Sequence, residues 1–164
     1  MNDVTIREAR RDEAGALTEL AMRAKASWGY DYAFMEACRA ELTLTPEKMA
    51  RWKVWVAEVD GAIAGMIALD LRDGAAVEDF FVEPAFQGRG VGGGLMATLL
   101  AACREAGAET LEVDADPNAE VVYARLGFET FARSPSGSIP GRTLPRMRRA
   151  VGGAYTIREP SLPQ

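Results

Sequence analysis

A glycine-rich segment in the middle of the chain has the composition of an anion-binding loop. Five of the seven residues from 88 to 94 are glycine, between a predicted strand and a predicted helix. Glycine costs about 1 kcal/mol relative to alanine inside a helix, so a run of glycines at a helix start needs a reason. Without side chains, a polyphosphate can approach the backbone, where free N–H groups and the helix dipole bind its oxygens. Arg89 would add a charged contact.

Three kinds of phosphate-binding loop can be compared with this segment. A Walker A loop is excluded, because no Lys-Ser or Lys-Thr pair follows the glycines. The dinucleotide-binding pattern Gly-x-Gly-x-x-Gly occupies residues 88–93, and Glu112 lies about 20 residues further on, as that fingerprint asks. Against it, five residues separate Val82, at the end of the predicted strand, from Gly88, and several antiparallel strands precede the motif. The third pattern is Gln-x-x-Gly-x-Gly at residues 87–92.

The absence of histidine and the low number of cysteines exclude several kinds of catalytic and metal site. The chain has no histidine, which excludes a Ser-His-Asp triad, a Cys-His pair and any histidine-ligated metal. Its two cysteines, Cys38 and Cys103, lie far apart without metal-ligand spacing and are interpreted as structural thiols in a reducing cytoplasm. We therefore predict no metal site, and a proton acceptor must be a carboxylate or a water chain.

The elements that must position these residues follow the order β-α-α-β-β-β-α-β-α-β-β. Strands are predicted at residues 4–9, 53–58, 63–71, 75–82, 110–115, 128–132 and 142–149, and helices at residues 12–28, 32–42, from 45, 90–106 and 117–126. Asp60-Gly61 and Asp73-Gly74 are typical of tight turns between antiparallel strands. An antiparallel N-terminal half joined to a C-terminal half with a βαβ unit predicts an α/β fold of the α+β type, with one mixed sheet and helices on both faces.

Length and charge are those of one acidic globular domain. The 164 residues are 48% hydrophobic and 26% charged, and 24 acids against 19 bases give a net charge of −5. This balance argues against nucleic acid as a partner. The N-terminus is charged and no apolar run reaches membrane length, so we predict a cytoplasmic protein without a membrane partner. Residues 1–150 are assigned to the domain and residues 151–164 to a loosely ordered tail. A homodimer is left open.

Further motifs accompany the third glycine pattern in a matching order. The pattern at residues 87–92 resembles the Q/R-x-x-G-x-G/A loop of the GNAT acyl-CoA-dependent N-acetyltransferases. The preceding Phe-Phe-Val-x-Pro at residues 80–84 resembles the end of that family's fourth strand, and the hairpin at residues 56–65 resembles its second and third strands. Residues 116–128 resemble the family's N-x-x-A-x-x-F-Y-x-x-x-G-F ending. The resemblance covers residues 4–149 and implies a single GNAT-like domain that uses acetyl-CoA.

The resemblance implies where this cofactor binds. In the family, the loop amides bind the pyrophosphate, and here they belong to Gln87, Gly88, Arg89, Gly90, Val91 and Gly92. The pantetheine arm pairs with the edge of the fourth strand, so the backbone of Phe81 and Val82 is expected to bind it, as an open strand edge pairs with any amide-bearing chain. Asn118 matches a position that contacts the cofactor arm.

The resemblance also implies an acid and suggests a base. Tyr123 matches the phenol that protonates the departing CoA thiolate, although Val122 replaces the usual Phe beside it. The alternative for Tyr123 is packing on the sheet. A phenol, with a pKa of about 10, suits a thiolate leaving group. Glu78 is the candidate base, because some relatives use a glutamate of this strand, and its alternative is a solvated strand residue. Alternation along the strand gives Glu78 the face of Val82 and turns Asp79 the other way.

The acceptor amine is expected beside the junction of the first two helices. Trp28, Tyr30 and Asp31 are interpreted as one wall of its pocket, or alternatively as residues that anchor the loop. Arg142 ends a Ser/Pro/Gly-rich loop at residues 134–142 and would meet a carboxylate of the acceptor. Acids and aromatic rings with an arginine at the mouth predict a small, zwitterionic amine.

These inferences combine into one predicted activity. The protein is expected to move an acetyl group from acetyl-CoA to the primary amine of a small molecule. Attack would be direct, in a ternary complex, because the motifs contain no Cys or Ser to carry the acyl group. The alternatives are a non-catalytic acyl-CoA-binding module and a dinucleotide-binding protein.

Overall fold

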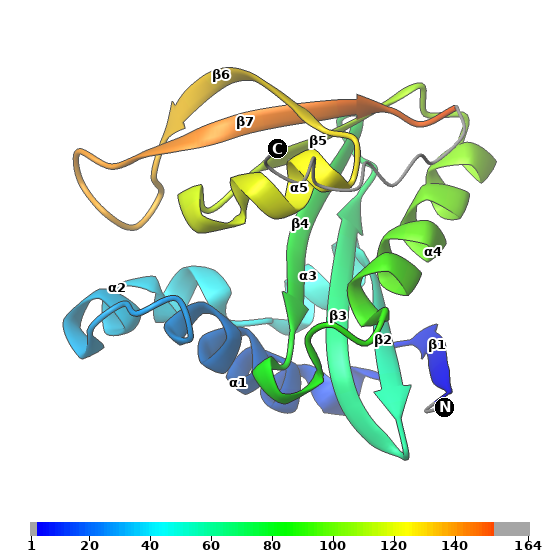
Figure 1. The fold of residues 1–164 in the computed structure, drawn as a ribbon, viewed down its shortest axis with the longest axis horizontal. Coiled ribbons are helices and arrows are strands. Elements are labelled where there is room, and N and C mark those ends of the chain that lie inside the picture. Colours follow the sequence, from blue (N-terminus) through cyan, green and yellow to red (C-terminus); the bar gives the residue numbers. More distant parts are fainter. Residues whose placement is uncertain (1–2, 153–164) are drawn as a thin grey trace, which may run out of the picture.

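The computed structural model describes residues 3–152, which build a seven-stranded sheet covered by helices on both faces (Figure 1). The strands are β1 (Val4–Glu8), β2 (Lys53–Val59), β3 (Ala62–Asp70), β4 (Ala75–Val82), β5 (Thr110–Asp114), β6 (Glu129–Pro135) and β7 (Thr143–Ala150). The helices are α1 (Ala14–Ala26), α2 (Tyr32–Leu42), α3 (Pro46–Arg51), α4 (Val91–Glu105) and α5 (Glu120–Arg125), with 3₁₀ turns at Arg11–Glu13, Pro84–Phe86 and Pro117–Ala119. The strand order is β1-β2-β3-β4-β5-β7-β6, which confirms the predicted mixed sheet.

Parallel pairing is limited to one short ladder, between β4 and β5. Residues 75–77 pair with residues 111–113, and the ladder ends there. Residues 79–82 of β4 still pair with β3 on the other side. The edge of β4 that faces β5 is therefore open beyond Val77 in the described chain. One short parallel pair is not the parallel sheet of a dinucleotide-binding fold, so that alternative is wrong.

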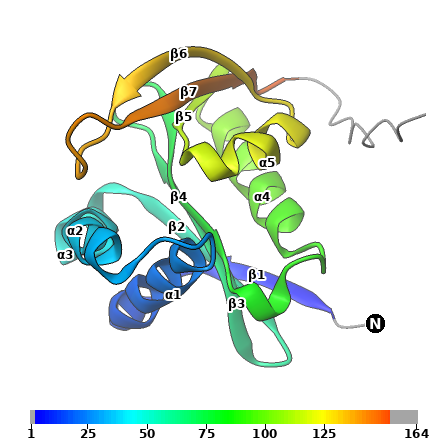
Figure 2. The same cartoon turned by 60° about the vertical axis from the view of Figure 1, so that its left-hand side comes forward.

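The two faces of the sheet are covered by different helices. Figure 2 shows α1, α2 and α3 on one side, and α4 and α5 on the other. On the first side, Leu17 and Leu20 of α1 are buried in one cluster with Met66 of β3. On the second side, Leu95 of α4 is buried in a cluster with Ile67, the next residue of β3. Successive strand residues therefore serve opposite faces, as the pleat requires.

Several predicted elements are confirmed at their boundaries. The helix at residues 32–42 and the strand at residues 75–82 are those of α2 and β4. Asp60 and Gly61 form the turn between β2 and β3, with φ values of 51° and 78°. Two positive φ values are what a tight two-residue hairpin turn needs, and an Asp-Gly pair supplies them readily.

The C-terminal elements run further than predicted. β6 extends to Pro135, which pairs with Thr143 of β7, so the connecting loop is shorter, at residues 136–142. Val151, which the sequence assigns to the tail, is buried, and its N–H donates to the Glu109 carbonyl (2.9 Å). The domain thus includes at least one residue more than predicted. The remainder of the predicted tail, residues 153–164, lies outside the described residues.

A bulge in β4 interrupts the alternation of side chains at Glu78. Ala68 of β3 pairs with Asp79 and Leu69 pairs with Val77, so Glu78 has no residue opposite it. An extra residue of this kind shifts the alternation of side chains along a strand. Asp79 is buried, Glu78 is exposed, and both line the same cavity. The predicted opposition of these two side chains is wrong for this reason.

Candidate active site

The loop before α4 carries a row of free backbone donors. Gly90 is the N-cap of α4, and its φ of 80° lies in the left-handed region that favours glycine. The first N–H that bonds back into the helix is that of Gly94, to the Gly90 carbonyl (3.1 Å). Within residues 3–152, the N–H groups of residues 88–93 donate no hydrogen bond. These successive donors lie at the positive end of a 15-residue helix, an arrangement that binds anions.

The glycines leave room for a ligand on these donors. A Cβ built at Gly88, Gly90 or Gly93 would meet no heavy atom within 4 Å. Arg89 is exposed beside them, with its guanidinium carbon 5.5 Å from the centre of the Phe86 ring. In the part of the chain that the structure describes, Arg89 has no ion-pair partner. The open loop and the free N–H groups fit a diphosphate, such as that of coenzyme A.

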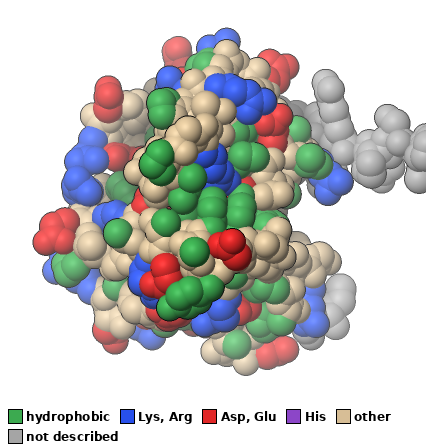
Figure 3. All heavy atoms as spheres, turned by 90° about the vertical axis from the view of Figure 1, so that its left-hand side faces the viewer, with side chains coloured by type: hydrophobic (Ala, Val, Ile, Leu, Met, Phe, Trp, Pro, Cys, Tyr) green, Lys and Arg blue, Asp and Glu red, His purple; other side chains and the backbone are tan. Residues whose placement is uncertain are grey.

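A cavity of about 280 Å³ lies where β4 and β5 cease to pair. Its walls come from α1, α2, β4, β5, α5 and the β6–β7 loop, and Phe80 and Phe81 of the open β4 edge line it. Figure 3 faces the end of the molecule with α2 and the β6–β7 loop, where hydrophobic side chains gather between acidic and basic ones. Ser136 and Ser138 bring the β6–β7 loop to this cavity.

Tyr123 lines the cavity from α5 and is packed among aromatic rings. Its ring centre lies 5.9 Å from that of Phe80 and 5.3 Å from that of Phe128. Its hydroxyl has no hydrogen-bond partner in residues 3–152. Burial, with a smaller contribution from the charge of Asp79, raises the pKa of the Tyr123 phenol above its ordinary value. The phenol is therefore protonated at neutral pH, which is the state that a proton donor requires.

Asp79 is a buried carboxylate without a partner in the described part of the chain. Its side chain belongs to a residue that is 9% exposed, and within residues 3–152 it forms neither an ion pair nor a hydrogen bond. Burial raises the pKa of Asp79 to about 7; the Glu78 charge adds to this shift and Lys48 opposes it. A carboxylate with this pKa, in the same cavity as Tyr123, can exchange a proton near neutral pH.

Glu78, the base predicted from the sequence, also lines the cavity. It lies on the bulge, is exposed, and has no ion-pair or hydrogen-bond partner in the described residues. Desolvation raises the pKa of Glu78, and the charges of Asp70 and Asp114 add to the effect. The structure thus presents two candidate proton acceptors at consecutive positions of β4, of which Asp79 is buried and Glu78 is exposed.

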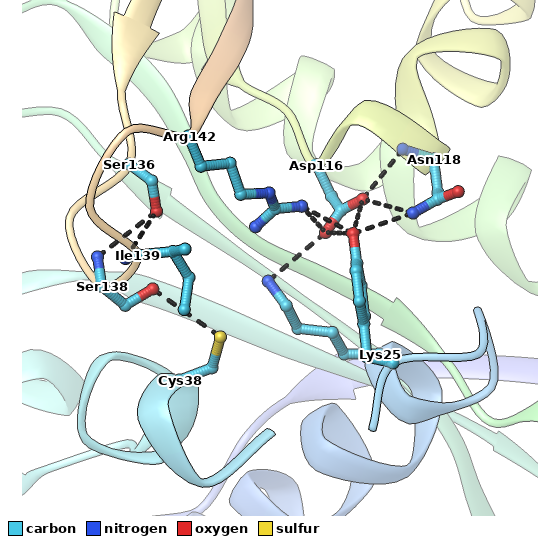
Figure 4. Close-up of polar contacts among 9 residues, drawn as sticks. Lys25, Cys38, Asp116, Asn118, Ser136, Ser138, Ile139 and Arg142 are labelled. Atoms are coloured by element: carbon cyan, nitrogen blue, oxygen red, sulfur yellow. Dashed lines mark hydrogen bonds and ion pairs between the residues drawn. The ribbon is translucent and has the colours of Figure 1, made fainter. Parts of the chain in front are cut away.

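A polar cluster around Asp116 forms another wall of the cavity (Figure 4). Its carboxylate accepts hydrogen bonds from Tyr30 Oη (2.9 Å) and Arg142 Nη2 (3.0 Å), and Lys25 Nζ lies 3.4 Å away. Tyr30 Oη in turn accepts hydrogen bonds from Arg142 Nη2 (2.6 Å) and Asn118 Nδ2 (2.8 Å). The cluster ties the α1–α2 loop to the β5–α5 connection and to the β6–β7 loop.

The charges in this cluster compensate one another. Burial raises the pKa of Asp116, but the Asn118 N–H, Arg142 and Lys25 lower it more. The net shift is downward, so the carboxyl group is ionised at neutral pH. Burial, together with Asp116, raises the pKa of Tyr30. The positive charge of Arg142 is therefore already shared with an ionised carboxylate.

The predicted acceptor residues have different surroundings. Trp28 lines the cavity, and Tyr30 and Arg142 meet in the Asp116 cluster. Asp31 is the N-cap of α2, where its side chain accepts the Phe34 N–H (2.8 Å), and it does not line the cavity. The capping function accounts for Asp31, and the assignment of the other three to the acceptor stays a prediction. So does the assignment of Asn118 to the cofactor arm.

Two residues of the site were missed by the sequence analysis. Asp79 was placed by strict alternation on the face opposite Glu78, and nothing in the local sequence marks the bulge that lets both residues line one cavity. Asp116 precedes Pro117, a pattern typical of a helix N-cap, and it does accept the Asn118 N–H (2.8 Å). Its contacts with Tyr30 and Arg142 have no sequence signal, since the partners are far away in the chain.

Two kinds of feature are absent from residues 3–152. No group of three or more His, Cys, Asp or Glu side chains is arranged to hold a metal ion. No helix of this part of the chain has both the length and the apolar composition for a membrane span.

Comparison with known proteins gives consistent relatives. Residues 15–148 match the model of a family described as an acetyltransferase (GNAT) domain. An uncharacterized N-acetyltransferase of Methanocaldococcus jannaschii is 28% identical over an alignment of 147 positions, which covers 76% of this chain and 60% of that protein. The chain therefore spans about three-fifths of the length of this relative.

Solved structures share the fold at low sequence identity. A GCN5-related N-acetyltransferase from Rhodopseudomonas palustris has a TM-score of 0.76 and 22% identity, over 92% of this chain and 97% of that one. The PaiA N-acetyltransferase from Thermoplasma acidophilum, solved in complex with coenzyme A, has a TM-score of 0.74 and 16% identity, over 90% and 99% of the two chains. At 22% and 16% identity, these similarities show a shared fold and not a shared substrate.

Proposed function

The chain belongs to the GNAT acetyltransferase family, and from this premise we propose that it transfers the acetyl group of acetyl-CoA to the primary amine of a small molecule. The observation that carries the proposal is that backbone groups without a hydrogen-bond partner in residues 3–152 lead from the start of α4, along the edge of β4, to the cavity. This path begins at the free N–H groups of residues 88–93, follows the open edge of β4, and ends at the cavity of Tyr123 and Asp79. Coenzyme A, which the PaiA structure contains, has a diphosphate and an amide-bearing arm that suit the first two parts.

The donor would be held by the chain's own backbone. The N–H groups of residues 88–93 would bind the diphosphate, with Arg89 adding a charge. The backbone of Phe81 and Val82 would pair with the pantetheine amides along the open edge. Asn118, whose side chain is exposed beside the β5–α5 connection, is proposed for the same arm.

Proton transfer would be divided between Asp79 and Tyr123. Acetyl-CoA supplies a thioester, and transfer forms an N–C bond, breaks the C–S bond, releases one proton from the amine and adds one to sulfur. Asp79 would first accept a proton from the bound ammonium group, which leaves the neutral amine that attacks, and its pKa of about 7 lets it do so near neutral pH. Tyr123, whose raised pKa keeps its proton in place, would donate to the thiolate. Glu78 is the alternative acceptor.

Direct attack in a ternary complex fits the side chains of the cavity. Neither cysteine lines it, and both are buried. Two serines do line it, but the Ser136 hydroxyl accepts the N–H groups of Ser138 and Ile139, and the Ser138 hydroxyl lies 3.6 Å from Cys38 Sγ (Figure 4). Neither hydroxyl is hydrogen-bonded to a base that would activate it as a nucleophile.

Replacement of Gly93 tests the donor site. Gly93 is the third residue of α4 and its Cβ space is open, so a glutamate fits without strain. At this position a glutamate carboxylate can bond the N-cap N–H of its own helix, here that of Gly90, and so compete with a phosphate. Gly93→Glu is expected to weaken acetyl-CoA binding by about 10-fold or more, while thermal stability is retained. The Kd is measured by isothermal titration calorimetry.

Gly93→Ala is the matched control, since it adds a Cβ without charge and should keep the Kd. An unchanged Kd for acetyl-CoA in folded Gly93→Glu would contradict the assignment of this loop. The non-catalytic alternative is tested on the unmodified protein. Release of CoA with a panel of primary amines would support the enzyme, and tight acetyl-CoA binding without release would favour a binding module.

A further inference from the structure

Three carboxylates at the cavity have no ion-pair partner among the residues that the structure describes. The side chains of Glu41, Glu78 and Asp79 line it, and within residues 3–152 none of them has an ion-pair or hydrogen-bond partner. Glu41 and Glu78 are exposed, whereas Asp79 is buried. A buried, unpaired carboxylate is unfavourable unless a bound group compensates it, so Asp79 in particular points to a ligand.

The basic residues of the same cavity contact groups other than these three carboxylates. Lys25 and Arg142 both contact Asp116, at 3.4 Å and 3.0 Å. Lys48 Nζ donates to the main-chain carbonyls of Glu41 (2.6 Å) and Thr43 (2.9 Å). The charges of Lys25 and Arg142 are therefore held at Asp116, and Lys48 is the one described basic residue of this cavity on the α2 side, where the carboxylates of Glu41, Glu78 and Asp79 have no ion-pair partner in residues 3–152.

A second cavity, of about 400 Å³, adjoins the first on the side of Glu41 and Glu78. Glu41, Glu78 and Asp114 line both cavities. Glu112 adds a fourth carboxylate to the second cavity. Arg146, its one basic residue among those described, lies 3.3 Å from Asp114 and 3.5 Å from Glu112. An elongated ligand that enters through the second cavity would thus pass a surplus of negative charge before it reaches Asp79.

The positions of these carboxylates are unfavourable for the free protein. Glu41 lies in the last turn of α2, where the helix dipole disfavours an acid. Its Oε1 lies against the β6–β7 loop, 3.3 Å from the point where a Cβ of Gly137 would lie. The pKa of Glu78 is raised by desolvation and by neighbouring acids, although Arg72 and Lys48 oppose this. A bound cation would relieve each of these costs.

We propose that the acceptor is an aliphatic diamine or polyamine, whose reacting amino group reaches Asp79 and Tyr123 while a second ammonium group lies between Glu41 and Glu78. The inference rests on the proposed function and names its substrate class. The aromatic rings of Trp28, Trp52 and Phe80 in the cavity wall suit a cationic, methylene-rich chain. A zwitterionic acceptor, as predicted from the sequence, relied on Arg142, whose charge Asp116 already shares.

Three four-carbon acceptors test the proposal. 1,4-Diaminobutane, n-butylamine and 4-aminobutanoate share a four-carbon chain and a reacting amine, and differ only in the distal group, which is positive, neutral or negative. At saturating acetyl-CoA and low salt, kcat/KM is expected to be about 10-fold higher for the diamine than for butylamine, and lowest for 4-aminobutanoate. The ratio of diamine to butylamine is expected to shrink as salt is added, because exposed Glu41 and Glu78 are screened.

A matched pair of variants assigns the effect to the site. Glu41→Gln is expected to lower the ratio of diamine to butylamine about threefold or more. Glu105→Gln removes an exposed carboxylate at the end of α4, outside both cavities, and should leave the ratio unchanged. Binding of 1,4-diaminobutane and of butylamine is also measured directly by calorimetry in the presence of coenzyme A.

The outcomes separate this inference from the proposed function. Equal kcat/KM for diamine and butylamine, preference for 4-aminobutanoate, or turnover confined to peptides would overturn the diamine proposal and leave acetyl transfer intact. If no amine is acetylated but the diamine binds more tightly than butylamine, acetyl transfer fails and the cationic site stands. If neither turnover nor binding distinguishes the two amines, the diamine proposal fails.

Discussion

Asp79→Asn is expected to lower kcat/KM for the amine about 1,000-fold, within the range that loss of a general base produces. The reason is that Asp79 is the buried carboxylate of the cavity, unpaired in the described chain, with a pKa of about 7. In the unmodified protein, kcat/KM should rise with pH through about 7 as Asp79 ionises. The variant should lose this limb of the pH profile, while acetyl-CoA affinity is retained. Steady-state rates from pH 5.5 to 9 measure both effects.

Glu78→Gln is the matched control, since Glu78 is the neighbouring residue and lines the same cavity. It should retain the limb near pH 7. If Glu78→Gln loses that limb and Asp79→Asn keeps it, the proton acceptor is the glutamate predicted from the sequence. If both variants keep the profile with full activity, the proton goes to water instead.

The same variant has an expected effect on stability with a definite sign. The pKa of Asp79 is raised to about 7 in the folded chain from an ordinary value of 3.8. Between these pH values the folded state binds more protons than the unfolded state, so this group's contribution is favourable at low pH and is lost as pH rises to about 7. Asparagine cannot ionise, so Asp79→Asn should gain stability relative to the unmodified protein between pH 4.5 and pH 8. Urea denaturation of both proteins at pH 4.5 and at pH 8 gives their free energies of unfolding. If the variant and the unmodified protein differ by the same amount at both pH values, the burial of an ionisable Asp79 is contradicted.

Tyr123→Phe is expected to lower kcat about 100-fold and to leave the Kd of acetyl-CoA unchanged. The substitution removes only the hydroxyl, which has no hydrogen-bond partner in residues 3–152, and keeps the ring packing with Phe80 and Phe128. The fold should therefore persist while protonation of the thiolate is lost. Single-turnover rates and calorimetry separate the chemical step from binding.

Tyr32→Phe provides the control for loss of a phenol. Tyr32 is 79% exposed at the start of α2 and does not line the cavity, so its variant should retain full activity. If Tyr123→Phe turns over as fast as the unmodified protein, Tyr123 is a packing residue, which is the alternative that the sequence left open.

Local sequence accounts for the elements whose residues carry their own signals. Helix α2 is marked by an Asp31 cap and a 3.6-residue apolar period, and the β2–β3 turn by Asp60-Gly61. The glycine run before α4 predicts an anion site because only local backbone is involved, and the free N–H groups there agree with it. These features depend on residues within a few positions of one another, so the order of residues alone is informative about them.

The direction of side chains in β4 was decided by pairing with another strand. Alternation predicts the face of a residue only while the ladder is regular. Glu78 is an extra residue relative to β3, and this irregularity brings Asp79 and Glu78 to one cavity. The burial that raises the pKa of Asp79 likewise comes from packing around the cavity, which no local pattern encodes.

By itself the sequence determined the kind of elements, their order, the free backbone donors of the glycine-rich loop that we propose for an anion and, through resemblance, the candidate role of Tyr123. The tertiary structure alone decided which charges meet. Tyr30 contacts Asp116, 86 positions away, and Arg142, 112 positions away, and these contacts engage the arginine that the sequence had assigned to a substrate carboxylate. The net charge at the cavity depends on acidic and basic side chains that come from α2, β4 and the C-terminal strands. Their effect depends on distances in space, because Coulomb interactions in a folded chain follow proximity and desolvation and not separation along the sequence.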